Sequence, residues 1–484
     1  MNIRQTIDTT PMGRMQWYII GLATFLNALD GYDILAMTFS SSAVREEFDL
    51  TGSQSGLLLS AALIGMTVGS LTLGPLADRM GRRRILIASL LVNFAGLALS
   101  ATAGSATELG LWRVVTGVGI GGILATVTVI TSEVSNNRHR GLAVSIYAAG
   151  YGVGATVGGS LSTWLIPTFG WRAMFAVGAA ATIVSLVLVI TSIPESMDYL
   201  QFRRPDGAEE KIRAVARKLG KDDSGLTIEL ATSGQPGQPG DAISSEAPAG
   251  TGAQPPKVTE LLSSQFRATT LKLWAAFFII MFGFYFANTW TPQLLVESGM
   301  TENQGILGGL ALTLGGTFGS LLFGLITVRF TSRHVLMVFS VLGAITLVVF
   351  ITTTSIPAIA FLSGVLVGML LNGCVAGMYT VTPEAYPSAL RTSGVGWGIG
   401  MGRFGGIFAP IIVGALLDAG WSPTALFSGV AVVVALAALA MIGIRPYLGT
   451  MRGASSAVSD APSDPASSAV SDTKPDATGV PHQS

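Results

Sequence analysis

The chain has 484 residues, of which 50% are hydrophobic and only 12% are charged, about half the charged fraction of an ordinary soluble domain. Its 28 basic and 28 acidic residues cancel, so the net charge gives no reason to expect a nucleic-acid partner. A single cysteine, Cys374, excludes an intrachain disulfide, and only three widely separated histidines argue against a metal site.

Twelve apolar runs are long enough to cross a bilayer as helices. The first six lie near 17–39, 54–76, 85–104, 108–131, 141–163 and 172–193. The second six lie near 271–296, 305–328, 334–353, 356–380, 392–417 and 422–444. The first run has no cleavage site after it, so it is not a removed signal peptide. We therefore predict an all-α membrane protein with twelve transmembrane helices in two six-helix bundles, 17–193 and 271–445.

Three polar segments flank these bundles: an N-terminus at 1–16, a central loop at 194–270 and a tail at 446–484. Within the loop, the charged stretch from Glu209 to Lys221 favours an amphipathic helix. The Gly/Pro/Ser-rich sequence around 235–256 is typical of a flexible linker. The composition of the tail indicates disorder.

The arginines predict the orientation in the membrane. The even-numbered loops are basic and hold Arg79, Arg82, Arg83, Arg84, Arg138, Arg140, Arg329, Arg333 and Arg391. The opposite loops are poor in basic residues, and in the first of them Arg45 stands beside Glu46, Glu47 and Asp49. Both termini and the central loop are therefore expected in the cytoplasm, with the chain in the cytoplasmic (inner) membrane.

The two halves resemble each other at an offset of about 250 residues. The segment 74–83 aligns with 324–333, although Val328 stands where the first half has Asp78. Glu133 precedes Arg140 by seven residues, and Glu384 precedes Arg391 by the same spacing. Repeated halves are typical of transporters, in which the site lies between the halves near the midplane.

The loop between the second and third spans resembles the signature of the major facilitator superfamily. It reads Gly74-Pro-Leu-Ala-Asp78-Arg79-Met-Gly81-Arg82-Arg83-Arg84. Arg113, Glu133 and the glycine series Gly150, Gly154, Gly158 and Gly159 are also similar to that superfamily. The chain departs from the family pattern at Ala155, where a proline usually follows the glycine.

Within the superfamily, Asp30-Gly31-Tyr32-Asp33 in the first span resembles the Asp-Gly-x-Asp motif of the aromatic acid:proton symporters. The resemblance covers roughly 17–445 and implies uptake of aromatic carboxylates of the benzoate, hydroxybenzoate, protocatechuate or gentisate class. It implies the proton gradient as the energy source, with no cofactor. A monomer is the default for this architecture.

Asp30 and Asp33 are the candidates for proton coupling. They are three residues apart and are therefore expected to share one helix face. Asp30 lies near mid-membrane, where a carboxylate is costly unless it faces a cavity or partner. The alternative is a structural carboxylate bonded to a neighbouring helix.

Arg403 and Arg113 are candidates for binding the substrate carboxylate. Arg403 lies about ten residues into the eleventh span, and its planar guanidinium matches a carboxylate. Arg113 lies near the outer end of the fourth span and could pair with Asp33. Arg403 could instead belong to a charge network that reaches Asp30 or Asp33. Each arginine also has a structural alternative: a buried pair for Arg403, and snorkelling to the lipid headgroups for Arg113.

Aromatic and amide side chains could form the wall of a site for a flat ring. These candidates are Tyr285, Asn288, Trp290, Trp397, Tyr147 and Tyr151. Plain helix packing is the alternative for each one.

Residues at the cytoplasmic ends of the spans are expected to gate the transporter through ion pairs rather than to touch substrate. The gating candidates are Gly74, Asp78, Arg79, Gly81, Arg82, Arg83, Glu133, Arg140, Glu384 and Arg391. Asp78 is also placed to cap the next helix, whereas the arginines could serve topology alone.

Other functions stay open. An exporter of drugs or metabolites would share this fold, and a sensor could bind aromatic acids without moving them, although no folded signalling domain accompanies the spans. An enzyme is not expected, since no nucleophile–base–acid set, metal motif or phosphate-binding loop is present.

Overall fold

The computed structural model describes residues 7, 10–136, 138–203, 207–219 and 260–444. Within these ranges the secondary structure is helical throughout, and twelve helices are long and apolar enough to cross a membrane. The prediction of twelve spanning helices is therefore confirmed. The predicted linker around 235–256 and the tail at 446–484 lie outside the described residues.

The N-terminal bundle contains the first six spanning helices. They are α2 (Arg14–Phe48), α3 (Gly52–Met80), α4 (Arg82–Ser100), α5 (Ala106–Val134), α6 (Arg140–Phe169) and α7 (Arg172–Ser192). Two short helices follow, α8 (Met197–Arg203) and α9 (Ala208–Lys218). Helix α9 is the predicted amphipathic helix, and it buries Ile212, Val215 and Ala216.

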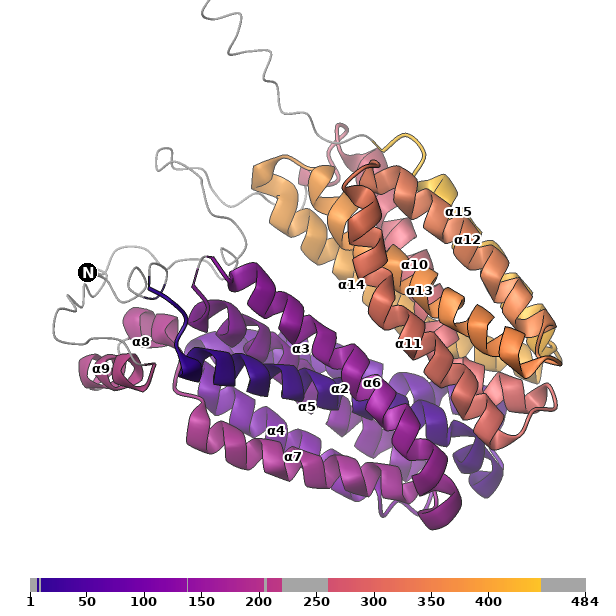
Figure 1. The fold of residues 1–484 in the computed structure, drawn as a ribbon, viewed down its shortest axis with the longest axis horizontal. Coiled ribbons are helices and arrows are strands. Elements are labelled where there is room, and N and C mark those ends of the chain that lie inside the picture. Colours follow the sequence, from indigo (N-terminus) through magenta and orange to yellow (C-terminus); the bar gives the residue numbers. More distant parts are fainter. Residues whose placement is uncertain (1–6, 8–9, 137, 204–206, 220–259, 445–484) are drawn as a thin grey trace, which may run out of the picture.

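The C-terminal bundle contains the other six spanning helices. They are α10 (Arg267–Glu297), α11 (Glu302–Thr327), α12 (Ser332–Thr352), α13 (Pro357–Glu384), α14 (Ser388–Asp418) and α15 (Pro423–Ala440). Figure 1 shows the two bundles as separate bodies, with α8 and α9 beside the N-terminal one.

The two bundles repeat the same helix neighbours. Helix α3 packs against α5 and α2 against α6, and the counterparts α11 with α13 and α10 with α14 do the same. Glycines allow the closest of these approaches: a Cβ at Gly117 would overlap the carbonyl oxygen of Ala62, and one at Gly368 would overlap that of Leu312. The repeat seen in the sequence is therefore a repeat of packed helices.

The molecule, with both bundles, has two distinct ends. We call the end with the α3–α4 and α5–α6 connections, which holds Arg82 and Arg138, the basic end; the other is the opposite end. At the opposite end the bundles touch: Arg45 forms an ion pair with Glu297, and Ser60 Oγ donates to the Ile407 carbonyl at 2.8 Å. Figure 1 shows the bundles meeting at this end and spreading apart toward the basic end.

Several helices extend beyond the predicted spans. Helix α2 runs from Arg14 to Phe48, whereas hydropathy predicts only 17–39. Its extra turns contain Arg45 and Glu47, which lower the hydropathy but form ion pairs, with Glu297 and Arg172 respectively. Hydropathy measures the apolar part of a span, and the polar turns at its ends are stabilised by contacts between helices.

Candidate functional site

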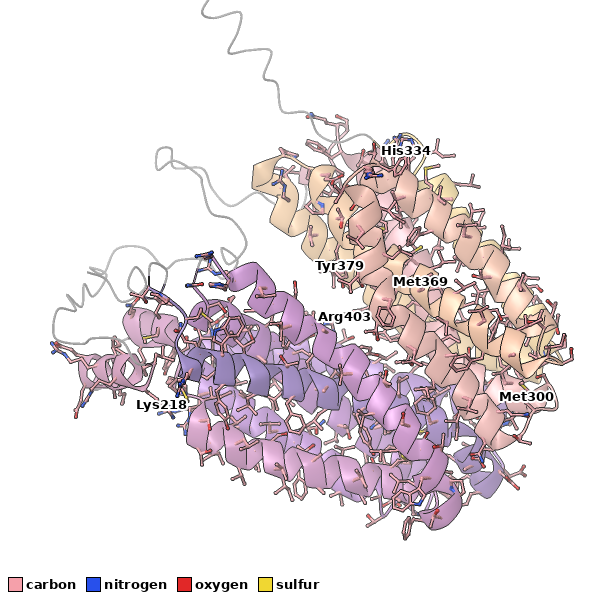
Figure 2. All side chains as sticks on the ribbon, in the orientation of Figure 1. Lys218, Met300, His334, Met369, Tyr379 and Arg403 are labelled. Atoms are coloured by element: carbon pink, nitrogen blue, oxygen red, sulfur yellow. The ribbon has the colours of Figure 1, made fainter. Side chains whose placement is uncertain are left out.

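A cavity of about 200 Å³ lies between the two bundles. Its polar lining residues come from six different helices: Asp30 (α2), Thr67 (α3), Tyr151 (α6), Tyr285 (α10), Tyr379 (α13) and Arg403 (α14). Apolar side chains that include Leu63, Met66 and Met281 complete its wall. Figure 2 shows Tyr379 and Arg403 on the face of the C-terminal bundle that is turned toward the N-terminal bundle. Flat apolar walls with a few convergent polar groups are typical of a small-molecule site.

Asp30 and Arg403 carry the charge of this cavity. The Asp30 side chain is buried, and its Oδ1 has no hydrogen-bond partner among the described residues. Nη1 of Arg403 is likewise buried without a hydrogen-bond partner in the described part of the chain. The two side chains interact electrostatically across the boundary between the bundles. A buried charged atom without a hydrogen-bond partner costs free energy, and a bound ligand can supply the missing partner.

Asp33 turns away from the cavity toward α5. Its Oδ1 accepts a hydrogen bond from Arg113 Nη1 at 2.6 Å, and its carbonyl accepts from Nη2 at 3.1 Å. Both side chains are almost fully buried, and the guanidinium lies over the Phe175 ring at 5.4 Å from its centroid. Arg113 therefore does not snorkel, and the predicted pairing with Asp33 is observed.

The sequence predicts one shared helix face for Asp30 and Asp33, but the two side chains face different partners. Their separation follows from helix geometry. Three residues correspond to about 300° of rotation and about 4.5 Å of rise, so the two side chains diverge by about 60°. That offset is sufficient for Asp30 to face the cavity while Asp33 faces α5. The two carboxylates still interact electrostatically.

Close contact between α2 and α6 supports the two aspartates. A Cβ at Gly154 would overlap the carbonyl oxygen of Ala28, and one at Gly31 would overlap that of Tyr151. Helix α6 is continuous from Arg140 to Phe169 despite its glycines. The glycine series thus serves close approach of the helices, which does not require the proline that Ala155 replaces.

The structure brings only part of the predicted ring-binding set to the cavity. Tyr151 and Tyr285 line it, whereas Tyr147, Asn288, Trp290 and Trp397 lie elsewhere. Trp290 is fully buried and its Nε1–H donates to the Pro410 carbonyl at 3.3 Å.

The other three have local partners as well. The Tyr147 hydroxyl is hydrogen-bonded to that of Thr128 at 3.1 Å, and Asn288 Nδ2 donates to the Phe284 carbonyl at 2.8 Å. Trp397 stacks on Trp274 with ring centroids 5.8 Å apart. Tyr147, Trp290 and Trp397 thus contact neighbouring helices, whereas Asn288 bonds within its own helix.

Two polar lining residues were not predicted. Tyr379 lies in α13 and Thr67 in α3, each within an apolar run. A lone tyrosine in such a run is a weak signal, and a lone threonine gives none, because helical threonines commonly bond to their own backbone.

The gating candidates of the first half form a network at the basic end. Arg82 forms ion pairs with Glu133 and, at 3.4 Å, with Asp78. Ser196 Oγ donates to Glu133 Oε2 at 2.7 Å. The start of α4 is capped by Glu195, which accepts the Arg83 backbone N–H at 3.0 Å, so the capping role expected of Asp78 falls to Glu195.

The remaining gating candidates lie at the same end. Gly81 has φ +105°, which favours glycine, and it joins α3 to α4. Glu384 accepts a hydrogen bond from Ser332 Oγ at 3.2 Å, the counterpart of the Arg82–Glu133 pair in the other bundle. The others are found in α3 (Gly74, Arg79), at the start of α6 (Arg140) and in α14 (Arg391).

The chain is similar in sequence to a known family and to several transporters. The model of the Major Facilitator Superfamily matches residues 20–319 and 299–470. The chain is 31% identical to the 4-hydroxybenzoate transporter PcaK of Acinetobacter baylyi, over 91% of this chain and 93% of that protein. It is 30% identical to the gallate transporter of Pseudomonas putida, over 91% and 94%. Identity to the benzoate transport protein of Acinetobacter baylyi is 27%, over 86% and 87%.

Solved structures share the fold at lower identity. The xylose transporter XylE of E. coli in an inward open conformation aligns with a TM-score of 0.66 at 18% identity, over 92% of this chain and 99% of that one. A bacterial homolog to the human lysosomal transporter Spinster aligns with a TM-score of 0.68 at 16% identity, over 89% and 97%.

Proposed function

Because the chain belongs to the major facilitator superfamily, we propose that it is a proton-coupled importer of aromatic carboxylates that works by alternating access to the cavity between its bundles. The relatives named for 4-hydroxybenzoate, gallate and benzoate support this substrate class. The resemblance of Asp30-Gly31-Tyr32-Asp33 to the symporter motif supports it as well.

One observation carries the proposal: Asp30 and Arg403 face one cavity from different bundles, each with a buried polar atom that has no hydrogen-bond partner among the described residues. A guanidinium binds a carboxylate through two parallel hydrogen bonds, so Arg403 is the anchor for the substrate anion. The apolar wall and the tyrosines around it then receive the aromatic ring.

Proton coupling is assigned to the aspartates of α2. When Asp30 is ionised it competes with the substrate carboxylate for Arg403, and protonation ends that competition. Proton binding therefore favours anion binding at the same cavity. Asp33 and Arg113 hold α2 against α5 next to this site.

The positive-inside rule assigns the basic end to the cytoplasm. The structure, closed at the opposite end, then corresponds to the state that faces the cytoplasm. The pairs of Arg82 with Asp78 and Glu133 lie within the N-terminal bundle and are already formed in this state. A gate at that side therefore requires contacts of these residues with the C-terminal bundle in the state that faces outward. The protein acts as a monomer in the inner membrane, with the proton gradient as its only energy source.

The test is uptake of radiolabelled benzoate, 4-hydroxybenzoate, protocatechuate and gentisate by cells that make the protein, with and without a protonophore. We expect accumulation of at least one acid that the protonophore abolishes. Arg403→Lys keeps the charge but loses the planar fork, so kcat/KM should fall about tenfold or more, the value of one charge-assisted hydrogen bond. Arg329→Lys, at an exposed position outside the cavity, is the matched control.

Three results would count against the proposal. Absence of uptake of every acid, with the protein verified in the membrane, would remove the substrate class. Flux out of loaded vesicles that is faster than influx under an inward proton gradient would indicate an exporter. Uptake by Asp33→Asn with unchanged dependence on the proton gradient would remove Asp33 from the coupling mechanism.

A further inference from the structure

Among the residues that the structure describes, Thr67 is the one aliphatic hydroxyl that lines the cavity. It lies on α3 in the N-terminal bundle, beside Leu63 and Met66, which line the same wall. Its Oγ1–H donates to the Leu63 carbonyl at 2.9 Å. Because that hydrogen bond uses the only hydrogen on the hydroxyl, Thr67 offers a ligand its oxygen lone pairs and no donor.

The other polar lining groups have different hydrogen-bonding character. Arg403 only donates. Tyr151, Tyr285 and Tyr379 each donate one hydrogen and can also accept. Asp30 accepts when it is ionised, and once protonated it donates one hydrogen while its other oxygen still accepts. In the protonated, substrate-binding state, Thr67 is thus the one lining side chain, among the described residues, that acts purely as an acceptor.

An aromatic acid presents two kinds of polar group to this arrangement. Its carboxylate only accepts, so it is matched by donors, and Arg403 on the C-terminal bundle is the one cation among the described lining residues. A ring hydroxyl donates, so it is matched by an acceptor. Thr67 lines the same cavity from the other bundle, so a ligand that spans the two bundles can contact both side chains.

We propose that Thr67 accepts the hydrogen bond of a ring hydroxyl at the edge opposite the carboxylate, and that the protein therefore prefers 4-hydroxylated aromatic acids to benzoate. This inference rests on the proposed function, which it narrows to a substrate subclass. A site that bonds a hydroxyl discriminates against the analogue that lacks it, since the polar group of the site is then left without its partner.

The experiment compares KM for the uptake of 4-hydroxybenzoate and benzoate in the wild type, Thr67→Val and Thr67→Ser. Valine has nearly the shape of threonine but no acceptor, and serine keeps the acceptor. For Thr67→Val we expect KM for 4-hydroxybenzoate to rise about tenfold, the value of one neutral hydrogen bond, with KM for benzoate within about twofold. Thr67→Ser should retain the wild-type preference for 4-hydroxybenzoate.

The possible results separate this inference from the proposed function. Equal weakening of both acids by Thr67→Val would show that Thr67 supports the helix alone, and would overturn the inference. A wild type that transports both acids with a lower KM for benzoate would overturn it too, while leaving the proposed function intact. Uptake of neither acid by the wild type would instead overturn the proposed function, and the inference with it.

Discussion

Asp418 closes the opposite end by capping a helix of the other bundle. It is the last residue of α14, and its Oδ1 and Oδ2 accept the backbone N–H groups of Gly52 at 2.5 Å and Ser53 at 2.8 Å. These are the first residues of α3, where the N–H groups have no partner inside the helix. The carboxylate also complements the positive end of the helix dipole. We therefore predict that Asp418→Ala favours opening at this end.

The size of the effect follows from these two contributions. Loss of a helix cap costs about 1 kcal/mol, and loss of a negative charge at a helix N-terminus costs about 0.3–1 kcal/mol. Both are present only while the bundles touch, so Asp418→Ala should raise the ratio of open to closed molecules roughly 5-fold to 30-fold at a total of about 1–2 kcal/mol. Asp418→Asn keeps one of the two acceptor oxygens and loses the charge, so its shift should lie between the wild-type ratio and that of Asp418→Ala.

Spin labels measure this ratio in reconstituted bilayers. Thr107→Cys in the N-terminal bundle and Ser355→Cys in the C-terminal bundle are exposed positions at the opposite end, with Cys374→Ala as background. Double electron–electron resonance should show that a larger fraction of Asp418→Ala molecules has a long distance between the two labels. Glu47→Ala is the matched control, because that carboxylate lies at the same end but is bonded within its own bundle. An unchanged distance distribution for Asp418→Ala would refute the reasoning.

Two further predictions concern the support of α2. Gly154→Val should lower the unfolding temperature in detergent, because its side chain would overlap the Ala28 carbonyl, and Gly154→Ala should do so less; an unchanged temperature for both would contradict the close contact. Asp33→Asn should destabilise the protein by about 3 kcal/mol or more, because it leaves the buried Arg113 charge uncompensated. Adding Arg113→Gln should recover part of that loss, and additive losses in the double variant would argue against a direct pair.

Much of the fold was accessible from the sequence because each spanning helix is a local property. A run of apolar residues must form its own backbone hydrogen bonds in lipid, so hydropathy alone locates the helices. The repeat added that the two halves share one architecture, and in the structure Gly117 and Gly368 allow a close helix approach in each bundle. The full length of α2 was not accessible, because Arg45 and Glu47 gain their stabilisation from ion pairs with other helices.

The charged residues of the candidate site could be predicted from the sequence, but its aromatic residues could be predicted only in part. A charged residue in a span must find a cavity or a partner, which led to Asp30, Arg403 and the pairing of Asp33 with Arg113. Aromatic residues have no such requirement, because a ring is equally stable in a helix contact and in a cavity wall. Trp290, for example, is fully buried and donates to the Pro410 carbonyl, whereas Tyr285 in the same helix lines the cavity.

The division of charges between the bundles constrains the transport mechanism. Asp33 and Arg113 both belong to the N-terminal bundle, so a rigid rotation of the bundles leaves their separation unchanged. Asp30 and Arg403 belong to different bundles, so the same rotation alters the interaction between them. In the proposed mechanism, the interaction of Asp30 with Arg403 is therefore the one that changes when the carrier reorients. Asp33, paired with Arg113, would contribute to proton coupling by holding Asp30 in position.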